Sequence, residues 1–194
     1  MGFVKNPETR LSVFWLGGAR RSATVPSPAA MNCTDAWNLL CEFTPSESLR
    51  KHALAVEAAM RHYAAKLGGD PEQWGLAGLL HDFDYERFPE PPAHTQEGAK
   101  ILRARGVDEE VIGAMLAHAN WNWADFPLDR PISKALFACD ELCGFVTAVA
   151  YVRPEKLRGM TSDSVKKKLK QKSFAAAVSR DDIAQGAALL GLPP

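Results

Sequence analysis

Helix boundary signals recur along most of this 194-residue chain, and they constrain its fold more than any other feature. Residues 44–47 (TPSE) combine a capping threonine, a proline suited to the first helical position and a glutamate placed as in a capping box. Gly68-Gly69 then offers the left-handed residue at which helices commonly end. Residues 70–73 (DPEQ) repeat the starting signal, and no stretch of useful length alternates apolar and polar residues. The sequence therefore predicts an all-α fold.

Apolar periodicity and chain breakers place the remaining helices. The second helix runs through WGLAGLLHD and ends near Asp82, because FDYERFPEPPA carries three prolines and must form a loop. Further helices are expected at residues 94–105, 108–118 and 131–151, with shorter ones within 161–190. The chain shows no internal repeat.

The first thirty residues differ in texture from the rest of the chain. Gly, Pro, Ser and Arg are scattered through residues 1–30 without a sustained period, so we interpret them as an N-terminal tail outside the core. Their short apolar run is a poor signal peptide, and translation starting at Met31 would also explain the change. Residues 31–194 are predicted to form a single domain.

The charge balance and the cysteines limit the partners and the compartment. Lys plus Arg and Asp plus Glu both number 23, so no overall field would hold the protein on nucleic acid or on an anionic membrane. The apolar stretch 136–152 contains Asp140 and Glu141 and is not a membrane span. Four unevenly spaced cysteines do not resemble a disulfide framework, so we expect a cytoplasmic protein. Nothing in the sequence indicates an oligomeric state.

Two helices carry a polar ligand-type residue on an apolar face. His52 recurs with Leu49, Val56 and Met60 at three- and four-residue steps, and Asp140 does so with Leu136 and its neighbours. A buried carboxylate must be paired, protonated or bound to a cation. A core histidine bonded to a carbonyl, and an ion pair with a buried Arg or Lys, are the structural alternatives.

His81 and Asp82 are adjacent where the second helix gives way to a loop, so both can turn toward one point. Imidazole nitrogen together with carboxylate oxygen suits Mn, Fe, Co, Ni or Zn better than Ca or Mg. Composition does not choose among these divalent transition metals.

His52, then LAGLLHDFDYE with His81-Asp82, then KALFACDELCGF with Asp140, resembles the H…HD…D signature of the HD-domain superfamily. The likeness runs from about Met31 to the C-terminus, and parts of it resemble a bacterial subgroup of predicted HD hydrolases. It implies an HD-domain helical bundle in which these four residues bind one metal, with His81 and Asp82 at the catalytic centre. The family's usual lysine after the HD pair is replaced by Asp84.

Some members of that superfamily bind a second metal through two further histidines. His94 and His118 lie between the HD pair and the final Asp, as that arrangement requires. A surface histidine and a satisfied core histidine are the respective alternatives. The resemblance, with a metal lowering the pKa of bound water, implies hydrolysis of a small phosphomonoester or phosphodiester, with nucleotides among the candidates.

Weaker signals concern the substrate. Arg87 and Lys134 lie near site segments and are candidates for stabilising the leaving oxygen, although either could be a solvated surface charge. Trp121, within Asn120–Trp123, could stack on a flat group or simply cover the core. The lysines between 166 and 172 could meet a phosphate, or form a solvated helix face. Nucleic acid is not indicated.

Two other functions fit the same ligands. Some HD-type proteins, of the myo-inositol oxygenase kind, hold two irons and activate oxygen, and the six potential ligands permit that chemistry. A non-catalytic module that senses a nucleotide is the other alternative. Metal analysis, oxygen consumption and a phosphoester panel would separate the three.

Overall fold

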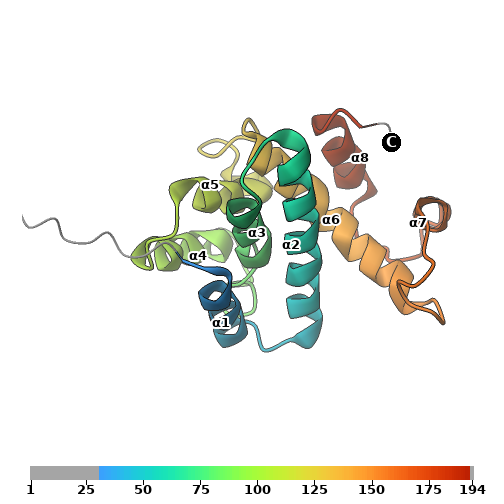
Figure 1. The fold of residues 1–194 in the computed structure, drawn as a ribbon, viewed down its shortest axis with the longest axis horizontal. Coiled ribbons are helices and arrows are strands. Elements are labelled where there is room, and N and C mark those ends of the chain that lie inside the picture. Colours follow the sequence, from blue (N-terminus) through green and yellow to red (C-terminus); the bar gives the residue numbers. More distant parts are fainter. Residues whose placement is uncertain (1–30, 193–194) are drawn as a thin grey trace, which may run out of the picture.

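The computed structural model describes residues 31–192, and within them it contains helices and no strands, which confirms the predicted all-α class (Figure 1). The elements follow in the order α1 (Cys33–Phe43), α2 (Glu47–Leu67), α3 (Pro71–Leu80), α4 (Ala93–Ala104), α5 (Glu109–His118), the 3-10 turn η1 (Asn120–Asn122), α6 (Pro131–Tyr151), α7 (Ser162–Leu169) and α8 (Arg180–Leu189). The proposed N-terminal tail, residues 1–30, lies outside the described residues.

The predicted helix starts at Asp70 and Asp108 are confirmed by their capping bonds. Asp70 accepts from the backbone N–H of Glu72, and Asp108 accepts from that of Glu110. The predicted cap of α2, Thr44, lies two residues before the observed one. Ser46 caps that helix, whereas Thr44 ends the preceding one and its hydroxyl donates to the carbonyl of Phe83 at 2.9 Å.

Helix α1 is absent from the sequence prediction, which began its helices at Thr44. Asn32 caps α1 by accepting from the N–H groups of Thr34 and Asp35. Its buried face consists of Ala36, Leu39, Leu40 and Phe43, at the three- and four-residue steps of an amphipathic helix. This helix therefore belongs to the core.

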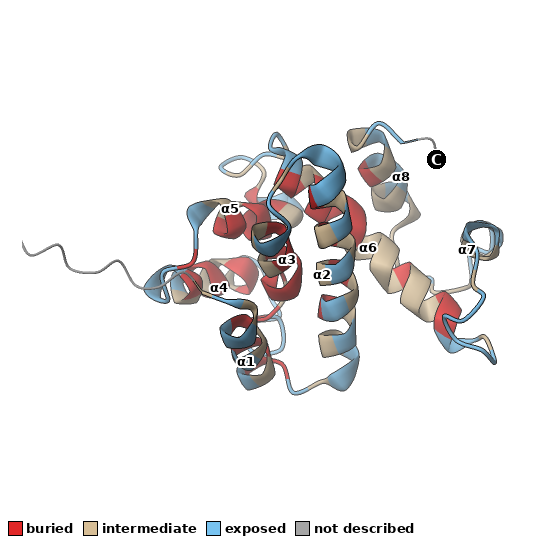
Figure 2. Ribbon diagram, in the orientation of Figure 1, coloured by how far each residue is buried: buried red, intermediate tan, exposed pale blue. Residues whose placement is uncertain are grey.

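The core lies where α3, α5 and the first half of α6 are enclosed by the other helices (Figure 2). Helices α2 and α3 approach closely because Gly78 has no side chain: a Cβ there would lie 2.9 Å from the backbone of Glu57. Helix α6 crosses α2 and carries α8, whose Gly186 rests against Ala138. These contacts fix the relative positions of α2, α3 and α6, which carry or end at the predicted ligands His52, His81 and Asp140.

Helix α7 and the last turns of α6 project from the bundle formed by α1–α5 (Figure 1). No residue of α7 is buried. Within residues 31–192, no helix combines the length and the apolar character that crossing a membrane requires.

Candidate metal centre

The structure brings the six predicted metal ligands together from five helices. His52 lies on α2, His81 ends α3, and Asp82 begins the turn that follows it. The other three come from α4, α5 and α6. His94 is the second residue of α4, His118 is the last residue of α5, and Asp140 lies within α6. Four of the six, all but His52 and Asp140, thus lie at or beside a helix end, where a side chain can turn away from the helix surface.

The first group consists of His52, His81, Asp140 and one oxygen of Asp82. Nε2 of His52 lies 2.9 Å from Oδ1 of Asp140 and 3.3 Å from Nε2 of His81. Nε2 of His81 also lies 3.4 Å from Oδ1 of Asp140 and 3.4 Å from Oδ2 of Asp82. Nε2 of His81 thus faces three potential acceptors, one each from His52, Asp82 and Asp140. A single proton on that nitrogen cannot serve all three.

The second group shares Asp82 with the first. Oδ1 of Asp82 lies 3.2 Å from Nε2 of His94 and 3.2 Å from Nε2 of His118. His52, His81 and Asp82 are close enough together to hold one ion, and so are Asp82, His94 and His118. Asp82 therefore stands between two potential metal positions, with one oxygen toward each.

Hydrogen bonds on the far side of three imidazoles set their tautomers. Nδ1–H of His81 donates to the carbonyl of Gly78 at 2.8 Å, and Nδ1–H of His118 donates to that of Met115. Nδ1–H of His94 donates to Oδ1 of Asp84 at 3.0 Å. With the proton held at Nδ1, the Nε2 lone pair of each ring points into the centre, as a metal ligand requires.

The spacing of these donors fits a transition metal. Two ligands bound at about 2.1 Å lie about 3.0 Å apart in octahedral geometry and about 3.4 Å apart in tetrahedral geometry. The six donor pairs described above are separated by 2.9 to 3.4 Å. Both carboxylates are about a quarter exposed, at 26% for Asp82 and 23% for Asp140, so the centre is open to solvent on that side.

The charges of the centre shift its pKa values in opposite directions. Burial lowers the pKa of His81, but the charges of Asp82 and Asp140 outweigh it and raise that pKa well above its ordinary value. Burial raises the pKa of both carboxyls, but the charge of His81 and the hydrogen bonds from the histidines lower them, most strongly for Asp82. The pKa of His94 rises to about 9, because hydrogen bonds to Asp82 and Asp84 outweigh its burial. The cluster therefore demands positive charge at its centre, from protons or from a cation.

Asp84 is a component of the centre that the sequence analysis noted only as a departure from the family's lysine. Its carboxylate is completely buried and accepts three hydrogen bonds. Besides His94, its donors are the backbone N–H groups of Thr95 at 2.9 Å and Gly98 at 3.0 Å. It thereby binds the backbone at the kink near the start of α4, where Thr95 adopts a left-handed conformation with φ of 70°. Asp84 thus orients a potential ligand and the helix that carries it.

The amide and aromatic cluster Asn120–Trp123 divides between two roles. Asn122 is buried and donates to the hydroxyl of Thr95 and to the carbonyl of Leu116, while Trp123 packs on Phe137. Trp121 is 43% exposed, and its ring centroid lies 5.8 Å from that of His94. Trp121 alone of the four lies at the edge of the centre with an exposed ring.

Tyr85 forms a second aromatic edge that the sequence analysis did not identify. Its ring lies 5.2 Å from that of His94 and is 41% exposed. His94 is thus flanked by two exposed aromatic rings. The only signal in the sequence is the position of Tyr85, three residues after Asp82 in the loop.

Neither of the two predicted cationic residues, Arg87 and Lys134, forms a hydrogen bond or an ion pair with the six ligands. The guanidinium of Arg87 stacks on the ring of Phe43 at 3.6 Å and donates to the carbonyl of Glu42, both on α1. Lys134 is half-buried in the first turn of α6, and no contact of its ammonium group with the six ligands is found. His62, the fifth histidine of the chain, is exposed, and Cys139 is buried in the core.

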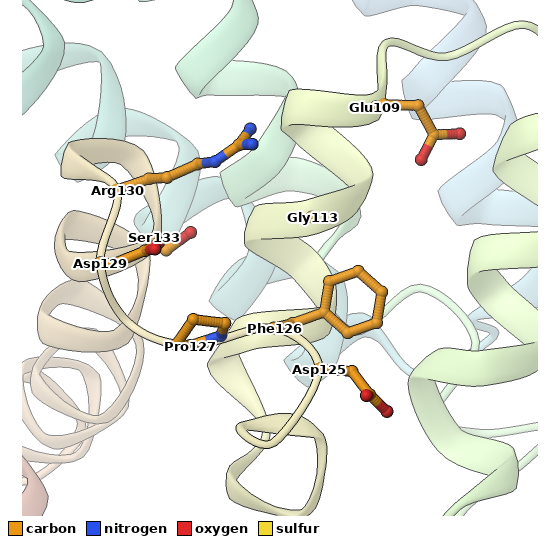
Figure 3. Close-up of a pocket in the computed structure, with 8 residues that line it drawn as sticks. All are labelled: Glu109, Gly113, Asp125, Phe126, Pro127, Asp129, Arg130 and Ser133. Carbon is orange, nitrogen blue, oxygen red and sulfur yellow. The ribbon is translucent and has the colours of Figure 1, made fainter.

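A cavity of about 350 Å³ between α5 and the start of α6 is separate from the metal centre (Figure 3). It is lined by residues such as Glu109, Phe126, Arg130 and Ser133, and none of its lining residues belongs to the six-ligand cluster. The potential catalytic chemistry therefore lies at the open ligand cluster and not in this cavity.

Comparison with known proteins agrees with this geometry. The family model described as HD domain matches residues 49–168, which span the helices that carry all six ligands. No curated protein matches the chain. No solved structure matches it either.

Proposed function

This chain belongs to the HD-domain family, and on that premise we propose that it is a metal-dependent phosphohydrolase. Its proposed substrates are small phosphomonoesters or phosphodiesters, with nucleotides as the favoured class. We propose one or two ions of Mn, Fe, Co, Ni or Zn as its cofactor.

The observation that carries this proposal is the arrangement around Asp82. One of its oxygens lies 3.4 Å from Nε2 of His81, and the other lies 3.2 Å from Nε2 of both His94 and His118. A carboxylate that faces imidazole nitrogens on both sides is suited to bridging two cations. Such a pair of positions favours in-line displacement at phosphorus, where attacking and leaving oxygens both need compensation.

The residues of the chain supply ligands, orientation and a substrate edge. A divalent ion held by the six ligands would lower the pKa of a coordinated water toward about 7 and neutralise charge on a phosphate. His81 and His118 present fixed Nε2 lone pairs, because their Nδ1–H groups are bonded to backbone carbonyls. Tyr85 and Trp121 offer exposed rings beside His94 on which a nucleobase could stack.

Asp84 is not available as a proton donor in this scheme. Its carboxylate is completely buried and is occupied by three donors. The lysine that is usual in the family after the HD pair is also absent from HDFDYE. We therefore propose that the ions themselves carry most of the compensation for charge on the leaving group.

The proposal is tested by metal content and phosphoesterase activity measured on the same preparations. Wild-type protein purified without chelator should carry one or two transition ions and hydrolyse p-nitrophenyl phosphate or its bis-ester. Asp82→Ala should lose both the ions and the activity while keeping its helical circular dichroism. Asp125→Ala, an exposed carboxylate outside the cluster, is the matched control and should keep both. Retained ions in the Asp82 variant would refute the assigned centre.

The same ligand set is also compatible with a di-iron oxygenase, since four imidazoles and two carboxylates suit iron. Iron as the dominant ion, with substrate-dependent oxygen consumption and no phosphoesterase activity, would favour that function. A non-catalytic nucleotide-sensing module would instead bind metal and be stabilised by nucleotides, without turnover of any phosphoester.

A further inference from the structure

The neutral net charge of this protein conceals a separation of charge along the chain. Residues 151–172, which we call the basic arm, contain eight Lys and Arg against two Asp and Glu. Residues 31–150 contain ten Lys and Arg against eighteen Asp and Glu. The arm therefore carries a net charge of +6 beside an acidic body, although the overall balance predicts no membrane partner.

The cations of the basic arm are not neutralised within the described part of the chain. Five Lys and Arg side chains of the body form ion pairs with carboxylates, as Arg61 does with Glu72 at 2.6 Å. Among the ion pairs of residues 31–192 none involves the arm, where Lys166, Lys167 and Lys170 are exposed. The arm projects away from the bundle, so this charge is presented outward (Figure 1).

Exposed apolar side chains accompany these cations at the tip of the projection. Tyr151, Val152 and Leu157 are 54%, 58% and 64% exposed, which are the three highest values among the exposed large hydrophobic residues described. Together with Leu54 of α2, Tyr151 and Leu157 line a mainly apolar cavity of about 540 Å³, where Lys156 also lies. A mainly apolar cavity with lysines, Lys51 and Lys156, among its lining residues is typical of an interaction site.

We propose that the basic arm docks the protein peripherally on an anionic lipid surface. Lysines attract the negatively charged headgroups, and the exposed apolar side chains enter the boundary between headgroups and acyl chains. The acidic body orients the molecule, because the same surface repels it. A nucleic-acid backbone would pair with the lysines but would leave Val152 and Leu157 exposed to water, so the lipid surface accounts for more of the observations.

Docking in this orientation leaves the metal centre accessible. Tyr151 lies eleven residues beyond Asp140 on the same helix, which is about 16 Å along its axis. A bilayer in contact with the tip of α6 therefore does not cover the six ligands. The inference is independent of the proposed phosphohydrolase activity.

Vesicle sedimentation with the full-length protein tests the proposal. The wild type should sediment with vesicles of phosphatidylcholine and phosphatidylglycerol at about 7:3, and not with phosphatidylcholine alone. Replacing Lys166, Lys167 and Lys170 together by Gln should weaken partitioning about fivefold per charge, or on the order of a hundredfold in total. Replacing Lys66, Lys100 and Arg105 of the body by Gln is the matched control and should not weaken it.

The apolar contribution has its own pair of variants. Leu157→Ser should reduce partitioning about tenfold, whereas Leu67→Ser, at an exposed leucine of α2, should leave it unchanged. All of these positions are exposed, so unchanged circular dichroism is expected. Equal sedimentation of the wild type and the arm variants would overturn the proposal. So would binding of a single-stranded RNA by a wild-type protein that ignores anionic vesicles.

Discussion

Replacing Asp84 by Asn should weaken ion binding at the second metal position, that of His94 and His118, while sparing the first. In the wild type, one oxygen of Asp84 accepts from the N–H groups of Thr95 and Gly98, and the other accepts from Nδ1–H of His94. An asparagine has one oxygen and one NH₂ group. Because two backbone donors require the oxygen, the NH₂ group must face His94 and donate to its Nδ1. The proton of that imidazole then moves to Nε2, the atom that faces Asp82, and the ring can no longer ligate there.

The expected magnitude follows from these bonds. Loss of the partner that orients a metal-bound histidine typically lowers metal affinity about 10- to 100-fold. The Asn variant keeps three hydrogen bonds but exchanges charge-assisted bonds for neutral ones, each about 1 kcal/mol weaker. The lower cost of burying a neutral group offsets part of that loss. The free energy of unfolding should therefore fall by only about 1–2 kcal/mol.

Metal titration monitored by calorimetry, with elemental analysis of the loaded protein, measures both effects. The Asn variant should bind one ion at wild-type affinity and the second at least tenfold more weakly. Asp108→Asn is the matched control, because Asp108 also accepts a backbone N–H at a helix start but lies outside the cluster. Two ions bound at wild-type affinity by the Asp84 variant would refute the role of this carboxylate.

Three further predictions concern pH, packing and thiol reactivity. The pKa of His94 without an ion is about 9, so a metal must displace a proton from this imidazole at pH 7. Calorimetry should therefore show metal affinity rising from pH 7 to 9, and an affinity that does not change with pH would contradict this. Gly78→Ala, which places a Cβ 2.9 Å from the backbone of Glu57, should cost about 1–3 kcal/mol in thermal denaturation, unlike Gly113→Ala, which meets nothing within 4 Å. Burial raises the pKa of Cys143 to about 12, so iodoacetamide at pH 8 should label it far more slowly in native than in unfolded protein, and equal rates would exclude this environment.

The sequence predicts helices well where the signals are local. Helix α6 has the predicted bounds because Pro131 is suited to the first helical position and the apolar pattern continues to Tyr151. The signals for α1 are also local, since Asn32 precedes an apolar pattern through Phe43, although the sequence prediction places the first helix start at Thr44.

The site is less predictable because its geometry depends on tertiary contacts. The ligand types and their positions near helix ends can be read from the sequence, as for His81-Asp82. The role of Asp84 cannot, because its acceptor bonds reach residues ten to fourteen positions away, and the kink of α4 at Thr95 depends on them. Likewise, only the fold assigns an exposed edge to Trp121 and a buried structural role to Asn122.

The hydrogen-bond acceptors of the histidine Nδ1–H groups differ in whether a substitution can remove them. His81 and His118 each bond to the carbonyl three residues earlier in a helix that ends there, and any residue at position 78 or 115 carries such a carbonyl. His94 relies on a side chain, and one codon change in Asp84 removes it. The two ion positions are therefore unequal: the second depends on the side chain of Asp84 for the orientation of His94, and a single substitution there can remove it. Whether this centre holds one ion or two therefore depends on one buried carboxylate outside the ligand set.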